Sequence, residues 1–327
     1  MSKTRGSAGW QGRRTDQRAG ENADQVEFSA VVYGATNLES GILDDRIADA
    51  LDDYDVADPA GVEEWAREDA KFDSATSDIG KEIARRSEVV GECYPFKAFG
   101  NRLEYTPSST YAYEFCLAVS QSPSLSTGDF SRLPPAFERL ARDVLSCFLG
   151  PEAEGMRTGW PSDRIEPHPS RFKAIVEELR ARTRARIDWS WHPRPGLPND
   201  PPPQHVKDGG IDFVVWKLMP DGRDGHLFLL GQCACGDDWE SKFYDLTEEK
   251  LSRWLNPIST APFLRVFTTP HHIPNDAYFA DVNINAGLTL DRARIARLAE
   301  SKMFRDRFVP QMKDSYKDLA DLVIRGR

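Results

Sequence analysis

The stretch Lys207-Asp208-Gly209-Gly210-Ile211-Asp212-Phe213-Val214-Val215-Trp216 decides the fold, together with Leu227-Phe228-Leu229-Leu230-Gly231-Gln232-Cys233. Each stretch holds an apolar run of β-branched and aromatic residues, which predicts a buried strand. The polar turn at 219–225 predicts that 211–217 and 227–233 form a hairpin-like pair. Such a pair would bring Asp212 near Gln232. A carboxylate and an amide inside an apolar sheet need a partner, and a metal ion is one such partner.

Composition indicates a folded protein of one large domain or two ordinary ones, because the chain has 327 residues, 40% of them hydrophobic, and eight Trp. No apolar run approaches the length of a membrane span, and the segment 1–6 lacks the apolar core of a signal peptide. The five cysteines are odd in number and lie mostly in apolar surroundings. We therefore expect reduced thiols in a cytoplasmic protein, with no membrane partner.

Charge is distributed unevenly along the chain. The net charge is −10, yet residues 21–80 hold 17 acidic side chains against 3 basic ones, so the rest of the chain is net positive. Basic residues gather at 1–19 and at 171–186. This pattern fits a DNA-binding module joined to an acidic segment that docks a partner protein or masks the DNA site, although solvated helix faces explain it equally well. The candidate DNA contacts are Arg180, Arg182 and Arg184.

Three regions follow from the pattern of apolar residues: a disordered tail at 1–24, an acidic and mainly helical region at 25–134, and an α/β domain at 135–327. We expect a mixed sheet over 187–268, flanked by amphipathic helices. The expected helices are 135–149, 170–186, 238–255 and 289–325, and the expected strands include 111–117, 187–191 and 263–267.

The order helix–strand–strand–strand–helix–strand from residue 170 onward resembles the core of the PD-(D/E)XK nuclease superfamily. In that family an Asp lies on the second strand, and a Glu or Gln, one spacer residue and a Lys lie on the third. Asp212 and Gln232 match these positions. The run 209–212, Gly-Gly-Ile-Asp, is similar to the Mrr-like restriction endonuclease branch, and the resemblance covers about 135–270. It implies a restriction-endonuclease-like fold and a DNA endonuclease.

One position departs from the family pattern, because Ala234 stands where the Lys is expected. The nearest candidate is Lys242, and the resemblance extends to family members in which the Lys has migrated. The pattern Gln-Cys-Ala-Cys-Gly-x-x-Trp-x-x-Lys at 232–242 also looks like a group of bacterial nuclease-like proteins. The departure leaves the catalytic competence of the site open.

The resemblance implies a role for each site residue. Mg²⁺ or Mn²⁺ would be held by Asp212 and the main-chain carbonyl of Cys233, while Gln232 supplies a neutral oxygen or orients water. Lys242 would hold the attacking water or stabilise charge. A helical Glu often completes such sites, and both Glu138 and Glu178 are candidates. Glu138 is slightly favoured, since Phe137-Glu138 is similar to the Phe-Glu that opens the first helix of Mrr-like enzymes.

Two functions remain open at this point. The first is a metal-dependent endonuclease acting on double-stranded DNA, as a bacterial restriction or phage-defence effector. The second is a degenerate nuclease fold that serves as a DNA-binding or scaffold subunit of a defence complex. The position of Lys242 separates them, because an enzyme needs its ammonium beside Asp212 and Gln232. The Cys and His pairs at 233–235 and 271–272 also suggest zinc, but their spacing is too short and a second Cys pair is missing.

Overall fold

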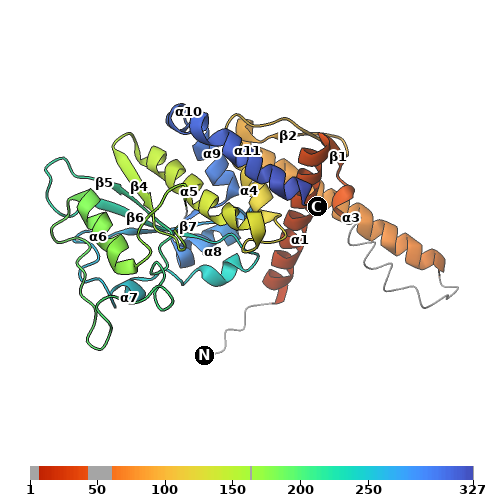
Figure 1. Ribbon diagram of the computed structural model, residues 1–327. Coiled ribbons are helices and arrows are strands. Elements are labelled where there is room, and N and C mark those ends of the chain that lie inside the picture. The colour runs from red at the N-terminus through yellow and green to blue at the C-terminus, as the bar shows by residue number, and fades with distance from the viewer. Residues whose placement is uncertain (1–6, 43–60, 163, 327) are drawn as a thin grey trace. The chain divides into compact units, whose positions relative to one another are not determined.

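The computed structural model describes residues 7–42, 61–162 and 164–326, with side chains except at 7–15 and 61–69 (Figure 1). The chain forms two compact units. The first comprises Met1–Ser109 and His272–Asp276, and the second comprises Thr110–His271 and Ala277–Arg327. The boundary therefore lies at 109/110 and not at the expected 134/135. No helix among the described residues is long and apolar enough to cross a membrane.

The first unit combines two long helices with a small sheet. Helices α1 (Ser7–Tyr33) and α3 (Gly61–Val90) pack together, and strands β1 (Ala35–Asn37), β2 (Phe96–Phe99) and β3 (Arg102–Tyr105) form an antiparallel sheet in the order β1-β3-β2. The expected tail at 1–24 is thus wrong from Ser7 onward, since α1 begins there. Residues 1–6, with Lys3 and Arg5, and residues 43–60 of the acidic segment lie outside the described residues.

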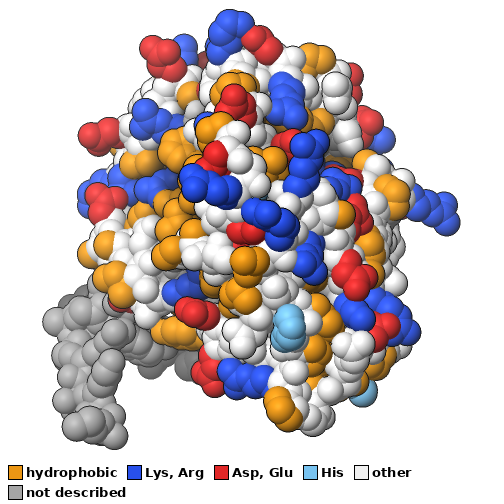
Figure 2. Space-filling model, turned by 90° about the vertical axis from the view of Figure 1, so that its left-hand side faces the viewer, with side chains coloured by type: hydrophobic (Ala, Val, Ile, Leu, Met, Phe, Trp, Pro, Cys, Tyr) orange, Lys and Arg blue, Asp and Glu red, His pale blue; other side chains and the backbone are white. Residues whose placement is uncertain are grey.

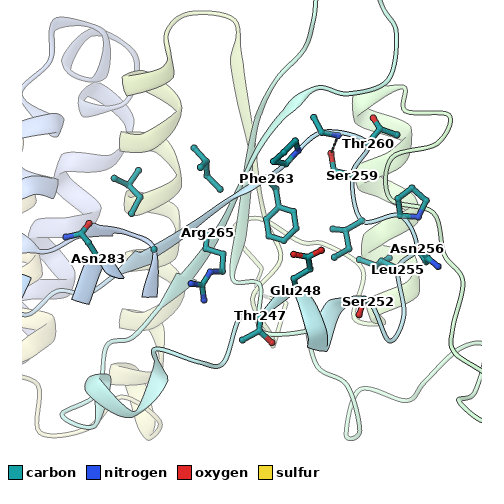
Figure 3. A pocket seen from close by; sticks show the side chains of 17 residues that line it. Thr247, Glu248, Ser252, Leu255, Asn256, Ser259, Thr260, Phe263, Arg265 and Asn283 are labelled. Atoms are coloured by element: carbon teal, nitrogen blue, oxygen red, sulfur yellow. Dashed lines mark hydrogen bonds between the residues drawn. The ribbon is translucent and has the colours of Figure 1, made fainter. Parts of the chain in front are cut away.

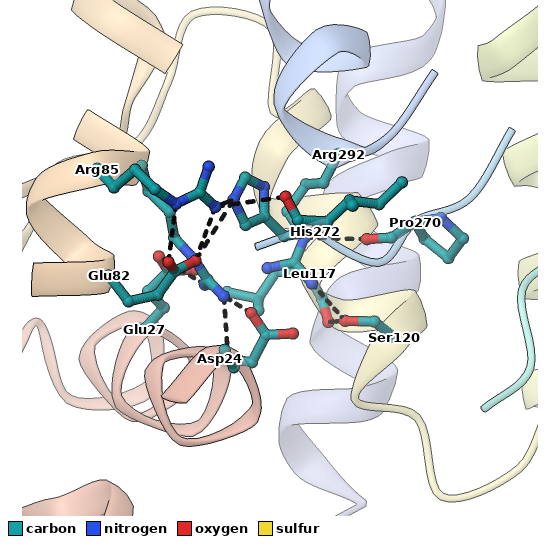
Figure 4. A network of polar contacts seen from close by, with 12 residues as sticks. Asp24, Glu27, Glu82, Arg85, Leu117, Ser120, Pro270, His272 and Arg292 are labelled. Atoms are coloured by element: carbon teal, nitrogen blue, oxygen red, sulfur yellow. Dashed lines mark hydrogen bonds and ion pairs between the residues drawn. The ribbon is translucent and has the colours of Figure 1, made fainter. Parts of the chain in front are cut away.

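A buried arginine joins α1 to α3. Arg86 is 1% exposed, and its guanidinium contacts Asp24 at 2.6 Å, Glu27 at 3.0 Å and Glu82 at 2.9 Å (Figure 4). Burying several charges is favourable only when they are paired and hydrogen-bonded, as they are here. Asp24, Glu27 and Glu82 are therefore acidic residues of the interior of the first unit, where they neutralise Arg86.

The second unit is built on a five-stranded mixed sheet in the order β4-β5-β6-β7-β8. Strands β4, β5 and β6 are antiparallel neighbours, whereas β7 and β8 run parallel to β6. Their bounds are β4 Ala153–Arg157, β5 Phe213–Lys217, β6 Leu227–Cys233, β7 Leu264–Thr268 and β8 Leu288–Leu290. The expected mixed sheet and the antiparallel β5–β6 pair are confirmed.

Helices cover both faces of this sheet (Figure 1). On one face, α6 (Phe172–Thr183) and α7 (Glu248–Leu251) bury a cluster that includes Val214, Trp216 and Leu230. On the other face, α5 (Leu133–Leu149) packs on β4, β5 and β6. Around α5 lie α4 (Ala112–Ser120), α9 (Arg292–Ala299), α10 (Lys302–Arg307) and α11 (Val309–Arg325), while α8 (Asp276–Ala286) precedes β8.

Several expected elements are wrong in detail. Residues 187–191 form a turn and not a strand, because Trp189 has a left-handed φ of 60° and only Trp191 makes an isolated bridge, to Leu255. The first strand of the sheet is instead β4, at 153–157, between the expected helices 135–149 and 170–186. The single helix expected at 238–255 is divided into a 3₁₀ turn, η3 (Trp239–Lys242), and the short α7. The segment 111–117 is the start of α4 and not a strand.

Candidate active site

Asp212 lies directly before β5, at the end of the β5–β6 pair. Its amide donates to the Gly231 carbonyl at 2.8 Å, and its Oδ2 accepts from the Cys233 amide at 2.6 Å. The register pairs Phe213 with Gly231, so the next residues along the two strands are Asp212 and Gln232. The expected neighbours are thus brought together at the carboxyl end of β6.

Glu138 reaches the same place from the first turns of α5. It is buried, and its Oε2 accepts from Nε of Arg157 at 2.5 Å. Arg157 closes β4, and its remaining nitrogens contact the Pro161 carbonyl at 3.0 Å and Nε2 of His168 at 3.2 Å. Between Glu138 and Glu178, the structure places Glu138 in the cluster. Glu178 pairs with Arg182 on the exposed side of α6.

Asp208 adds a third carboxylate through the Gly-Gly turn. Its Oδ1 accepts from the Gly210 amide at 2.8 Å, and its Oδ2 accepts from the Trp160 amide at 3.0 Å. Gly209 and Gly210 have φ values of 70° and 81°, in the left-handed region that favours glycine. The turn therefore depends on both glycines, and it carries the chain from Asp208 to Asp212 within four residues.

Burial raises the affinity of all three carboxylates for protons. Burial, with smaller contributions from Glu138 and Asp208, raises the pKa of Asp212 well above its usual range. Burial also raises the pKa of Glu138 to about 7, despite the opposing charge of Arg157. The pKa of Asp208 is raised as well, again chiefly by burial. The negative charge of the cluster is not fully balanced by positive charge, and binding either protons or a cation would reduce this imbalance.

Oxygen donors suited to a hard cation are present here, but the carboxylates alone do not enclose one. No group of three or more His, Cys, Asp or Glu side chains within the described ranges is arranged to hold a metal ion. A cation beside Asp212 would need further oxygens, and the buried Gln232 amide and the main-chain carbonyl of Cys233 are candidates on the neighbouring strand β6.

Lys242 does not join this cluster, contrary to expectation. Its Nζ lies 3.8 Å from Oδ2 of Asp238 and 3.9 Å from Oδ2 of Asp245, and its side chain is 42% exposed. The 3₁₀ turn η3 ends at Lys242 and directs the side chain toward these surface carboxylates. The expected helix that would have carried Lys242 back to Asp212 does not form.

The proposed DNA-contacting arginines have local partners. Arg180 donates to the carbonyls of Ala185 and Arg186 beyond the end of α6, and Arg182 pairs with Glu178. Arg184 is exposed and ends the helix with a left-handed φ of 53°. Figure 2 shows Lys and Arg side chains spread over one face of the molecule with Asp and Glu among them, so that face is mixed and not uniformly basic.

The cysteines near the site, Cys233 and Cys235, are partly buried thiols whose surroundings favour the neutral form. All five cysteines are free. Burial raises the pKa of Cys233 and of Cys235 well above the usual thiol range, and the Asp212 and Glu138 carboxylates raise both further. A cysteine binds zinc as a thiolate, so this environment disfavours zinc binding by Cys233 and Cys235.

A separate cavity of about 920 Å³ opens at the other end of the sheet (Figure 3). It is bordered by α7, by the loop 256–263 and by the start of β7. The register pairs Leu229 with Leu264 there and Cys233 with Thr268 at the Asp212 end. The charged residues in its lining are Glu248 and Arg265, and Arg265 donates to two main-chain carbonyls. The cavity therefore lacks the clustered titratable groups found around Asp212.

Two members of the cluster were missed from the sequence. Asp208 lies in the decisive stretch, four residues before Asp212, and its position before two glycines was a usable signal. No sequence pattern indicated Arg157, because it ends strand β4, whose polar residues do not predict a strand.

Comparison with known proteins adds no relative: no protein family, curated protein or solved structure matches this chain.

Proposed function

We propose that this protein is a metal-dependent endonuclease acting on double-stranded DNA, as a bacterial restriction or phage-defence effector. The observation that carries the proposal is the meeting of buried Glu138 from α5 with Asp212, the residue directly before β5, at the carboxyl end of β6. Carboxylates that face one another in a polar pocket at a sheet end are a common arrangement for binding a catalytic cation.

The topology supports the same proposal. Helix α5, the antiparallel strands β4, β5 and β6, the short helices η3 and α7, and the parallel strand β7 follow the order helix–strand–strand–strand–helix–strand, with α6 inserted between β4 and β5. This is the order of the PD-(D/E)XK core. The first helix of that order is α5 and not α6, which explains why Glu138 and not Glu178 meets Asp212.

The residues present fit a hard divalent cation such as Mg²⁺ or Mn²⁺. Asp212 and Glu138 would supply charged oxygens, and Gln232 and the main chain at Cys233 would supply neutral ones. A bound cation supplies a more acidic water and shields charge on the phosphate.

The chain's own residues position the donors. The Cys233 amide fixes Oδ2 of Asp212, and Arg157 fixes Oε2 of Glu138. Each bond holds one oxygen of a carboxylate in place, and the second oxygen would be the one that binds a ligand. Burial reduces the screening of these charges by water, so the carboxylates would attract a bound cation more strongly than exposed carboxylates do.

Plasmid nicking with Mg²⁺ or Mn²⁺ tests the proposal. The parent protein is expected to convert supercoiled plasmid to open-circle and linear forms, and Asp212→Asn is expected to reduce the rate at least on the order of a hundredfold. Circular dichroism of both proteins establishes that the variant is folded. A parent protein that is inert with both metals, or a variant that cleaves at the parent rate, contradicts the proposal.

The scaffold function is the second candidate, and one observation favours it. Lys242 is ion-paired with Asp238 and Asp245, and Ala234 leaves the family's Lys position without an amine. A degenerate nuclease fold would keep DNA binding and lose cleavage. In that case DNA binds with a steep salt dependence while plasmid remains supercoiled with every divalent metal.

A further inference from the structure

An exposed tryptophan stands at the rim of the carboxylate cluster. Trp160 is 41% exposed, although an indole ring is normally buried in large part. Its main-chain amide donates to Oδ2 of Asp208 at 3.0 Å, so the residue is one hydrogen bond away from the cluster. The ring therefore faces solvent beside the charged groups.

The backbone that carries Trp160 is anchored by the site itself. The Gly159 amide donates to the Asp212 carbonyl at 2.8 Å, and the Pro161 carbonyl accepts from Arg157 at 3.0 Å. With the bond from the Trp160 amide, three consecutive residues are tied to three members of the cluster. An exposed ring on a rigid main chain loses little conformational entropy when it binds a flat ligand.

An ammonium lies over the same ring. Nζ of Lys207 is 5.6 Å from the centroid of Trp160, and Lys207 directly precedes Asp208 in the chain. Lys207 is exposed, and no ion pair engages its ammonium within the part of the chain that the structure describes. In contrast, Arg157 is buried and Lys242 is paired elsewhere. Lys207 is thus an accessible cation next to the carboxylates.

The geometry points to Trp160 and Lys207 as a nucleotide-binding site. There the indole stacks on an unpaired base of a DNA strand, and the ammonium contacts the phosphate of that nucleotide. This inference rests on the proposed function and narrows the substrate to DNA that presents a single-stranded nucleotide, such as an end, a gap or an opened base pair. Stacking on an exposed aromatic requires a base outside the duplex stack, and it tolerates any base because each has a flat face.

A DNA-binding assay under conditions without cleavage tests this nucleotide-binding site. Full-length protein is titrated into fluorescein-labelled oligothymidylate and, separately, into a blunt-ended duplex, with EDTA present to prevent metal-dependent cleavage. Trp160→Ala is expected to weaken single-strand binding about five- to a hundredfold, and Trp160→Phe is expected to restore most of the loss. Lys207→Gln is expected to reduce the slope of log K against log salt by about one.

Two matched variants control for loss of any exposed aromatic or lysine. Phe148, 61% exposed at the end of α5, is changed to Ala, and Lys317, exposed on α11, is changed to Gln. Both are expected to bind like the parent. The inference is overturned if Trp160→Ala binds oligothymidylate as tightly as the parent, if blunt duplex is weakened as much as single strand, or if the parent binds no single strand.

The outcome is separable from that of the proposed function. A protein that binds single strands through Trp160 and never nicks plasmid retains this inference and loses the endonuclease proposal. A protein that nicks plasmid equally well with Trp160→Ala, and whose oligothymidylate affinity is unchanged, retains the endonuclease proposal and loses this inference.

Discussion

The carboxylate of Glu138 lies against the main chain of Gly159. A Cβ atom at residue 159 would be 2.3 Å from Oε2 and 2.7 Å from Cδ of Glu138, far inside van der Waals contact. The absence of a side chain at this position is therefore what allows Glu138 to approach the segment that follows β4. Glycine here provides space and not a special backbone angle.

Gly159→Ala is expected to displace the Glu138 carboxylate from Arg157 and to reduce cleavage strongly. Overpacking of this kind costs about 1–3 kcal/mol, so thermal melting should shift by several degrees. Gly80→Ala is the matched control, because its Cβ would meet only Leu38 at 3.6 Å and alanine favours the helix α3. A Gly159→Ala protein with parent cleavage and parent melting temperature would show that Glu138 adjusts freely.

Stability without metal is expected to fall as pH rises from about 4.5 to about 7. The pKa of Glu138 is raised from 4.5 to about 7, so the folded protein binds more protons than the unfolded chain over this interval. For Glu138 alone the loss is on the order of 3 kcal/mol, complete above pH 7. Asp212, whose pKa is also raised, contributes in the same direction. Melting curves in EDTA across this range measure the decline.

Asp212→Asn is expected to flatten that decline, because the amide keeps an oxygen for the Cys233 amide and removes a buried charge. The variant should have a higher melting temperature than the parent at pH 8, by about 2–4 °C for each kcal/mol gained in the free energy of unfolding. Asp221→Asn is a suitable control, since the pKa of this exposed carboxyl is lowered by Arg223 and lies outside the cluster. Parallel pH profiles for parent and Asp212→Asn would contradict the raised pKa of Asp212.

Lys242→Ala is expected to leave the plasmid-nicking rate within about twofold of the parent rate. Its ammonium pairs with Asp238 and Asp245 on the exposed turn η3, and exposed pairs contribute about 0–1 kcal/mol to stability. A hundredfold loss, the scale for removing a charge-stabilising group, would instead mean that η3 rearranges when DNA binds.

Arg182→Gln with Arg184→Gln is expected to flatten the salt dependence of duplex binding if α6 contacts phosphates. Arg180 is left in place, because its bonds to the carbonyls of Ala185 and Arg186 hold the end of the helix. Replacing Lys302 and Lys317 with Gln removes the same charge from α10 and α11. Equal slopes for the two double variants would assign Arg182 and Arg184 to a solvated helix face.

The sequence was informative where burial differs between the two sides of an element. The β5–β6 pair and α5 were predictable, because their apolar residues are continuous or follow the helical period. Helix α4 was misread as a strand, since Ala112–Val119 are all buried and a helix buried on every side loses that period. Edge strand β4 was missed because Glu154, Gly155 and Arg157 give it little strand character.

The candidate site was only partly predictable for a related reason. Asp212, Gln232 and Glu138 lie on elements whose type was clear. Arg157 and Trp160 are placed by bonds to Glu138 and Asp208 from distant parts of the chain, which no local pattern encodes. Helix α1 was missed within the expected tail at 1–24 for a similar reason. Its small residues Gly20 and Ala23 pack closely but carry no hydropathy signal.

The assignment of His272–Asp276 to the first unit has a practical consequence for dissecting the chain. The polypeptide passes between the units three times, after Ser109, after His271 and after Asp276. A single proteolytic nick or one stop codon therefore cannot release either unit intact. Deleting 1–109 would remove the contacts of Glu82 with His272 and of Arg85 with the Ile273 carbonyl. The segment 272–276 would then lose the residues of the first unit against which it packs. Separate expression requires replacing 272–276 as well as removing the amino-terminal residues.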